Sequence, residues 1–300
     1  MTRRNTPRIS FIGFGEAGQA IASGLRDEGI ERIAAWDILF PESAGARLKT
    51  AGDAIGVRIA TSAADAVRET DLVISAVTAA SSLEAARSVA PHLAGNPYYL
   101  DINSVSPGRK QETAKLLAER ARYVDVAVIA PIHPARHRTP LLLSGGQAEE
   151  ISPLLRELGM QLTVVSDETG SAAAIKMIRS VMIKGIEALT LECFLAAERA
   201  GVLEEVTASL KNNYPTLDWT KIADYNLERM ASHGERRAAE MEESAATLRE
   251  LGLEPLMVDS TVQRQREMGA LGKHEKVRKT LTSGRAAMLG AISTAAKDRT

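Results

Sequence analysis

The chain reads Ile9-Ser10-Phe11-Ile12-Gly13-Phe14-Gly15-Glu16-Ala17-Gly18-Gln19-Ala20-Ile21-Ala22, and this stretch decides the fold of the first half. Its first four residues predict a buried strand, and the small residues after Glu16 predict a helix. The glycines between them have the G-x-G-x-x-G spacing of a turn that binds the pyrophosphate of a dinucleotide. In such a turn Gly13 permits the tight bend, Gly15 lets the backbone approach the phosphates, and Gly18 lets the helix pack close to the strand.

An acidic residue, Asp37, ends the next expected strand, nineteen residues after Gly18. A carboxylate in this position accepts hydrogen bonds from ribose hydroxyls and repels the 2′-phosphate of NADP. Residues 38–41 contain no Arg or Lys for that phosphate, although Arg47 and Lys49 follow. We therefore expect NAD as the cofactor and keep NADP as the second choice. The residues expected to contact it are Gly13, Phe14, Gly15, Glu16, Ala17, Gly18, Asp37, Val77 and Asn103.

Short β-branched runs alternate with Ala-rich helical segments through the first half of the chain. Strands are predicted at 8–12, 32–36, 57–60, 72–76, 98–102, 123–128, 141–144 and 161–165. Helices are predicted near 16–28, 42–51, 62–69, 80–90 and 107–120. This alternation is typical of an α/β fold with a doubly wound, mainly parallel sheet. The last strands follow each other with little helix between them, so we expect them to form a mixed edge.

After residue 167 the pattern becomes wholly helical. Helices are predicted at 169–199, 203–212, 217–232, 234–251 and 256–270. Residues 273–300 are weakly patterned, and we expect their polar end, 295–300, to be frayed. The sequence thus predicts a dinucleotide-binding Rossmann domain over residues 1–167 and an all-helical domain for substrate binding and dimerisation over 168–300.

Composition excludes several classes of function. Aromatic residues make up 4% of the 300 residues and the net charge is −1, which argues against nucleic-acid binding. No His, Cys and Asp set has the spacing of a metal site, so no metal is expected. The first apolar run is too short for a signal peptide or a membrane span, so we expect a cytoplasmic protein without membrane contact. The single cysteine, Cys193, lies in an apolar stretch and is expected to be buried.

A second chemical centre is expected on the helix that begins near residue 169. Lys176, Ser180 and Lys184 are spaced i, i+4 and i+8, so they lie on one helical stripe. A lysine can exchange a proton with a hydroxyl during hydride transfer if burial and a second cation lower its pKa. Lys184 is placed to be that cation or to bind a substrate anion. An ordinary surface lysine is the alternative for Lys176.

Three further groups are candidates for substrate binding. Ser104 follows Asn103 at the carboxyl end of the fifth strand, where open α/β sheets bind ligands. Arg136 lies in a Pro-bounded loop and could hold a carboxylate, or could simply be solvated. His233 and Arg237 share one face of a charged helix and could line a cleft. Acidic neighbours make an ion-paired surface helix the alternative for this pair.

Four blocks of the sequence resemble the β-hydroxyacid dehydrogenase family, which includes 3-hydroxyisobutyrate and 6-phosphogluconate dehydrogenases. The blocks are residues 13–18, 101–107, 124–128 and 170–180. The resemblance implies a Rossmann domain followed by a helical domain, a site between them, and a homodimer formed through the helical domains. It also implies reversible NAD(P)-linked oxidation of a 3-hydroxy acid, with Lys176 as general acid/base. The C-terminal half resembles a helical domain of unknown function found in phosphogluconate-dehydrogenase-like proteins.

Two departures from the family leave the substrate open. Ser180 stands where the family has Asn, and Ile129-Ala130-Pro131 replaces a Ser-Gly-Gly substrate loop. The favoured hypothesis is a dehydrogenase of a small anionic hydroxy acid or a related hydroxy or keto compound. An imine reductase is an alternative, although such relatives usually lack the lysine. A protein that binds NAD as a sensor, without turnover, is the third hypothesis.

Overall fold

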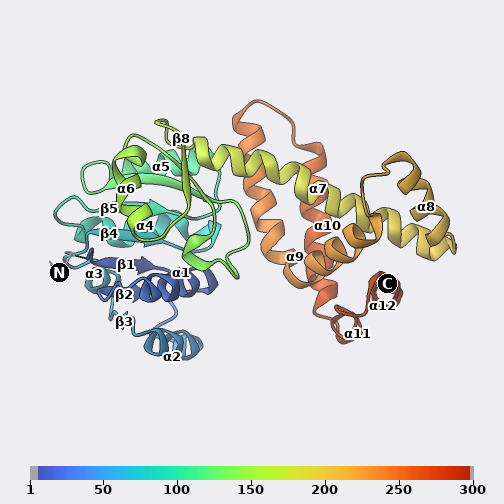
Figure 1. Ribbon diagram of the computed structural model, residues 1–300, viewed down its shortest axis with the longest axis horizontal. Coiled ribbons are helices and arrows are strands. Elements are labelled where there is room, and N and C mark those ends of the chain that lie inside the picture. Colours follow the sequence, from blue (N-terminus) through green and yellow to red (C-terminus); the bar gives the residue numbers. More distant parts are fainter. Residues whose placement is uncertain (1–5, 298–300) are drawn as a thin grey trace. The chain divides into compact units, whose positions relative to one another are not determined.

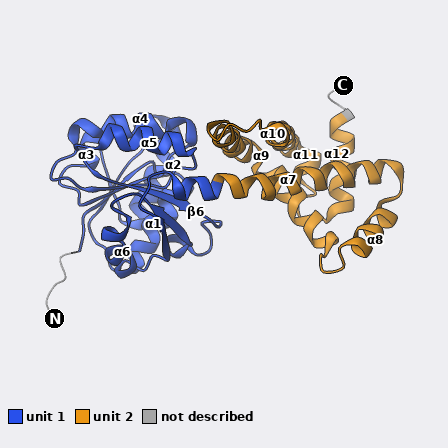
Figure 2. Ribbon diagram, turned by 90° about the horizontal axis from the view of Figure 1, so that it is seen from above, with its two compact units in different colours: residues 1–176 blue, residues 177–300 orange. Residues whose placement is uncertain are grey.

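The computed structural model describes residues 6–297, and it divides the chain into two compact units. The first unit runs from Met1 to Lys176 and the second from Met177 to Thr300 (Figure 2). The sequence pattern changes earlier, after residue 167, where the last predicted strand ends. The units divide inside the long helix α7, Ser171–Ala200, because the first turn of α7 is hydrogen-bonded to strands of the first unit.

The first unit contains one eight-stranded sheet with the order β3-β2-β1-β4-β5-β6-β7-β8 (Figure 1). All eight predicted strands are present. They are β1 Ile9–Ile12, β2 Ile33–Trp36, β3 Arg58–Ile59, β4 Leu72–Ser75, β5 Tyr98–Asp101, β6 Arg122–Val128, β7 Leu141–Ser144 and β8 Leu162–Ser166. The strand order reverses at β1, which lies between β2 and β4. Open α/β sheets bind ligands at such a reversal, outside the carboxyl ends of the strands.

The far edge of the sheet is mixed, as predicted, but it contains a helix that the sequence analysis missed. β7 pairs antiparallel with β6 and parallel with β8. A parallel pair needs a crossover, and helix α6, Ala148–Glu157, supplies it. The acidic start of α6 and the proline inside it obscure the helical pattern. The helix forms because it buries Ile151 and Leu155 against the sheet.

Helices cover both faces of this sheet, as a doubly wound fold requires. They are α1 Glu16–Asp27, α2 Ala46–Ile55, α3 Ala63–Ala66, α4 Ser82–Val89, α5 Pro107–Leu117 and α6. Neighbouring residues of one strand point to opposite faces, so Phe11 belongs to one core and Ile12 to the other. Figure 2 shows α4 and α5 on one side of the sheet and α1 and α6 on the other.

The second unit is helical throughout its described residues. It contains most of α7, then α8 Leu203–Asn213, α9 Trp219–Glu250, α10 Leu256–Gly272, α11 Glu275–Arg278 and α12 Arg285–Lys297. Helix α9 is continuous, whereas the sequence pattern predicts two helices that meet before Gly234. The glycine serves packing instead, because a Cβ on Gly234 would lie 2.3 Å from the carbonyl oxygen of Gln265 on α10.

Two other expectations about the second unit are wrong. The sequence predicts no helix over residues 273–300, but Arg285–Lys297 form α12, which buries Met288, Leu289 and Ile292 and includes residues 295–297 of the expected frayed end. Residues 298–300 of the expected frayed end lie outside the described residues. Cys193 is exposed, because the buried face of α7 at this level presents Leu191 and Phe194. Between residues 6 and 297, no helix combines the length and the hydropathy needed to cross a membrane.

Candidate active site

The glycine turn between β1 and α1 has the geometry of a pyrophosphate cradle. Gly13 has φ +89°, and a Cβ there would lie 2.4 Å from the carbonyl oxygen of Ala76. A Cβ on Gly18 would lie 2.6 Å from the carbonyl oxygen of Gly13, which explains the close approach of α1. A Cβ on Gly15 would meet nothing within 4 Å, so the space over this residue is open. Because no side chain caps α1 at Gly15, the first turn of the helix fits a phosphate.

Asp37 lies at the end of β2 and contacts the glycine turn directly. Its Oδ2 accepts a hydrogen bond of 2.7 Å from the backbone N–H of Phe14, and its Oδ1 accepts one of 3.0 Å from the N–H of Leu39. The carboxylate is half-buried. Each oxygen retains a further lone pair, so the group can still accept bonds from ribose hydroxyls.

Val77 and Asn103 lie beside the turn and are joined to each other. The Oδ1 of Asn103 accepts a bond of 2.7 Å from the N–H of Val77, and its Nδ2 donates to Ser75 Oγ at 2.9 Å. Asn103 is buried. Its side chain therefore joins the carboxyl ends of β4 and β5, and direct contact with the cofactor stays a prediction.

Lys176 and Ser104 are brought together at the carboxyl edge of the same sheet. The Nζ of Lys176 donates a hydrogen bond of 2.5 Å to Ser104 Oγ. Ser104 follows β5, and Lys176 lies in the second turn of α7. Residues that the sequence places 72 positions apart thus meet at the carboxyl edge of the sheet that carries the predicted cofactor turn.

Lys184 and Ser180 form a buried group with an acidic residue of α9. The Nζ of Lys184 donates to Ser180 Oγ at 3.1 Å and pairs with Glu240 Oε2 at 3.0 Å. Burial lowers the pKa of Lys184, and the neighbouring Glu240 carboxylate acts against that shift. The ammonium group already has an anionic partner, so it is not free to bind a substrate anion in this conformation.

Arg237 is held by an ion pair inside the second unit. Its guanidinium donates two hydrogen bonds to Glu187, one from Nε at 3.1 Å, and Gln265 donates to the same carboxylate at 2.8 Å. Arg237 is 6% exposed, so the ion-paired alternative describes it better than a substrate clamp does. His233, one turn earlier on α9, is half-buried.

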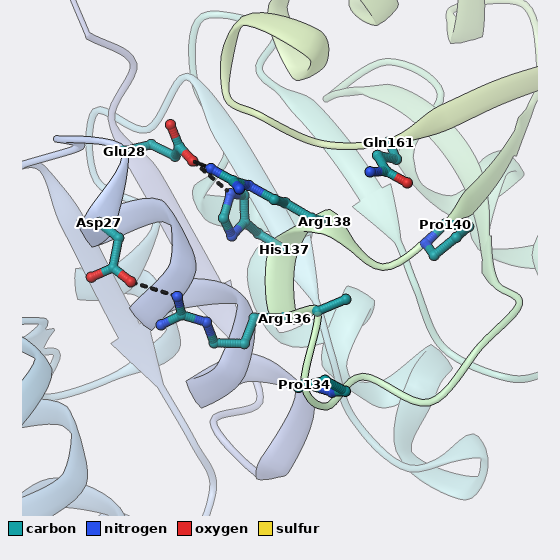
Figure 3. A pocket seen from close by; sticks show the side chains of 9 residues that line it. Asp27, Glu28, Pro134, Arg136, His137, Arg138, Pro140 and Gln161 are labelled. Atoms are coloured by element: carbon teal, nitrogen blue, oxygen red, sulfur yellow. Dashed lines mark hydrogen bonds and ion pairs between the residues drawn. The ribbon is translucent and has the colours of Figure 1, made fainter.

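Arg136 lies at the opposite end of α1 from the glycine turn. It donates to Asp27 at 2.6 Å and to Ser23 Oγ at 3.1 Å, while Arg138 and His137 both contact Glu28 (Figure 3). These side chains line a hollow of 610 Å³. A helix of this length separates its two ends by about 18 Å. The structure therefore does not bring Arg136 to the other candidate residues.

The comparisons with known proteins identify the family. Residues 8–166, more than half of the chain, match the model described as the NAD binding domain of 6-phosphogluconate dehydrogenase. The chain belongs to the β-hydroxyacid dehydrogenase family. It is therefore an NAD(P)-dependent oxidoreductase whose first unit is the NAD-binding domain. Residues 197–268 match a domain of unknown function, DUF1932.

Several proteins are similar to this chain over most of its length. A conserved hypothetical protein from Sinorhizobium meliloti 1021 is 37% identical, with 96% of each chain covered and a TM-score of 0.76. An uncharacterized 28.5 kDa protein of Methanothermus fervidus is 28% identical over 85% of this chain and 96% of its own. The 3-hydroxyisobutyrate dehydrogenase of Mycobacterium tuberculosis, solved with L-serine, has a TM-score of 0.71. It is 14% identical, with 96% of this chain and 99% of that chain covered, so it shows the shared fold.

The first unit also contains a buried cluster of three charged residues that was not predicted from the sequence. Lys110 of α5 pairs with Asp101 Oδ1 at 3.0 Å and with Asp125 Oδ1 at 3.4 Å, and all three residues are fully buried. The available signal was an aspartate inside each of two apolar strands, which is unusual unless the charge is paired. Within residues 6–297, no group of three or more His, Cys, Asp or Glu residues is arranged to hold a metal ion.

Proposed function

We propose that the protein transfers a hydride between NAD and a small anionic hydroxy acid, or a related hydroxy or keto compound, with Lys176 as general acid/base. The observation that supports this most strongly is the bond of 2.5 Å between Lys176 Nζ and Ser104 Oγ at the carboxyl edge of the sheet. The edge beside a strand-order reversal is where the fold binds its ligand. A lysine at this place can therefore reach a substrate that lies against the nicotinamide.

The residues of the first unit divide the binding task. The glycine turn and the N-terminus of α1 would hold the pyrophosphate, and Asp37 would accept bonds from the adenine ribose. The bound nicotinamide supplies or accepts the hydride. In the oxidative direction Lys176 would take the proton of the substrate hydroxyl. In the reductive direction the lysine returns that proton to the carbonyl oxygen.

The preference for NAD rather than NADP is part of the proposal. It is supported by the position of the Asp37 carboxylate, which accepts a bond from Phe14 of the glycine turn. A phosphate on the ribose 2′-oxygen would bring negative charge against this carboxylate. Ile38, directly after it, is 81% exposed and offers no positive charge.

Ser180 is the proposed partner of the substrate oxygen in place of the family's Asn. It follows Lys176 by one turn of α7, and its oxygen accepts a bond from Lys184. A hydroxyl whose oxygen already accepts can donate its own proton to a ligand. Lys184 thus contributes through Ser180, and His233 remains a candidate substrate residue. Arg136 and Arg237 are left out because Asp27 and Glu187 hold their guanidinium groups.

A homodimer formed through the helical unit is also proposed. On α7, the side chains of Ile178, Met182, Ile183, Ile186 and Leu189 are between 39% and 65% exposed. Exposed apolar surface of this kind marks contact sites in proteins that fold in water. A second copy of the chain is the proposed partner, as the family resemblance implies.

A turnover panel separates the proposed function from its two alternatives. Purified protein is assayed with NAD and hydroxy acids, and separately with NADH or NADPH and cyclic imines or keto acids. We expect oxidation of a hydroxy acid with NAD. Imine reduction without hydroxy-acid oxidation would identify an imine reductase instead. Tight NAD binding without any turnover would favour the sensor and overturn the proposal.

A further inference from the structure

The buried cluster of Lys110, Asp101 and Asp125 lies directly beneath the proposed catalytic pair. Asp101 ends β5 and Asp125 lies on β6, and the two are register partners across the parallel pair. Lys110 reaches both from α5, and its Nζ also donates to the carbonyl oxygen of Asp101 at 2.6 Å. None of the three residues touches solvent. Charged groups are rarely buried fully unless they are paired, and removing one partner leaves an uncompensated charge.

The Asp101 carboxylate fixes the loop that presents Ser104. Its Oδ1 accepts a hydrogen bond of 3.0 Å from the N–H of Asn103, and its Oδ2 accepts one of 2.9 Å from the hydroxyl of Tyr123. Ser104 is the next residue of the loop. The position of the Ser104 hydroxyl therefore depends on the hydrogen bonds of the Asp101 side chain.

The Asp125 carboxylate fixes the start of the helix that presents Lys176. Its Oδ2 accepts a bond of 3.0 Å from the N–H of Ala173 and one of 2.9 Å from the Ser144 hydroxyl. The same Ser144 oxygen accepts from the N–H of Ala172 at 3.0 Å. Asp125 and Ser144 thus cap α7 from neighbouring strands, and a negative charge is favourable at this end of a helix. Lys176 lies one turn further on.

The ammonium group of Lys110 lies between the two buried carboxylates and offsets their mutual repulsion. Register partners on adjacent strands lie close, and two buried negative charges at that separation repel. Without the ammonium group this repulsion is unopposed. The carboxylates would then be displaced from the positions in which they accept the backbone N–H groups of Asn103 and Ala173.

We propose that Lys110 is a positioning residue that holds Ser104 and Lys176 in register for proton transfer. It acts through Asp101 on one side and Asp125 on the other, and it touches neither cofactor nor substrate. The inference rests on the proposed role of Lys176. A displacement of about 1 Å between reacting groups can lower the rate by about 100-fold, so a rigid support for Ser104 and Lys176 has a large effect on turnover.

The test replaces the charge at similar volume with Lys110→Met, and uses Lys115→Met, exposed on the same helix, as the matched control. We expect kcat of Lys110→Met to fall by about 10- to 100-fold with NAD affinity unchanged. Hydrogen exchange is measured in parallel on the peptide that contains Ala172 and Ala173. We expect faster exchange there, with the β1 and α1 segments as protected as in the wild type.

A double variant, Lys110→Met with Asp101→Asn, removes the repulsion and leaves the Asp125 carboxylate in place as an acceptor for the Ala173 N–H. Hydrogen exchange at Ala172 and Ala173 in the double variant is expected to return toward the wild-type rate. This measurement tests the inference even if the single variant does not fold. Uniformly faster exchange over the whole first unit, or no recovery in the double variant, would overturn the inference. The exchange readout needs no substrate, so it stands even if the turnover panel contradicts the proposed function.

Discussion

Asp37 has two tasks at the scale of a single residue. Its carboxylate accepts hydrogen bonds from the N–H groups of Phe14 and Leu39, and it is the proposed acceptor for the ribose hydroxyls. The first task needs an oxygen acceptor, whereas the rejection of a 2′-phosphate needs the negative charge. Substitutions can therefore separate the two tasks.

Asp37→Asn is expected to narrow the preference for NAD over NADP while the turn stays folded. The amide oxygen still accepts from Phe14, but the charge that repels the 2′-phosphate is gone. Hydrogen bonds to charged groups contribute about 1.5–3 kcal/mol, so NAD affinity should fall by about tenfold or more. Kd values for both cofactors, from fluorescence titration, check this. An equal loss of affinity for both cofactors would mean that Asp37 only supports the turn.

The sequence predicts the role of a residue when that role depends only on a short local motif. The glycine turn follows from the spacing of Gly13, Gly15 and Gly18 next to an apolar run. Lys110 could not be found in this way, because its role depends on the register that places Asp101 beside Asp125. The partner of Lys184 was hidden for the same reason, since Glu240 comes from another helix.

At the scale of elements, periodicity located all eight strands, but it missed helices α6 and α12 and split α9. A strand in a parallel sheet is a short apolar run, which is visible locally. Helix α6 was missed because its acidic first turn and its proline resemble a loop. Helix α9 was split at Gly234, where the glycine serves the close approach of α10 rather than a turn.

The exposed apolar face of α7 predicts self-association of the helical unit. Wild-type protein is expected to run as a dimer of two 32.2 kDa chains in light scattering. Met182→Glu combined with Leu189→Glu should give monomers, because burying unpaired charges in the contact is costly. Lys211→Glu, an exposed site on α8, is the matched control and should remain dimeric. A monomeric wild type, or a dimer that survives both glutamates, would contradict this proposal.

At the scale of the whole molecule, each unit has cores of its own. Two cores lie on the two faces of the sheet, and two more lie among the helices of the second unit. The sequence was sufficient for the fold class and for a nicotinamide dinucleotide as cofactor, because both follow from local patterns of the chain. The substrate does not follow, because Ser180 and Ile129-Ala130-Pro131 depart from the family's substrate residues. Arg237 of α9, a candidate for substrate binding, is paired with Glu187 inside the second unit.

The central claim, that Lys176 moves the proton during hydride transfer, is tested most directly by single-turnover kinetics of Lys176→Ala. The substrate is the hydroxy acid with the highest turnover in the panel, and NADH formation is followed by absorbance. General acid–base groups contribute about 10²- to 10⁴-fold, so the rate constant should fall by that factor. The Kd for NAD should stay at the wild-type value, because the glycine turn and Asp37 are intact. A wild-type rate constant in Lys176→Ala would contradict the account.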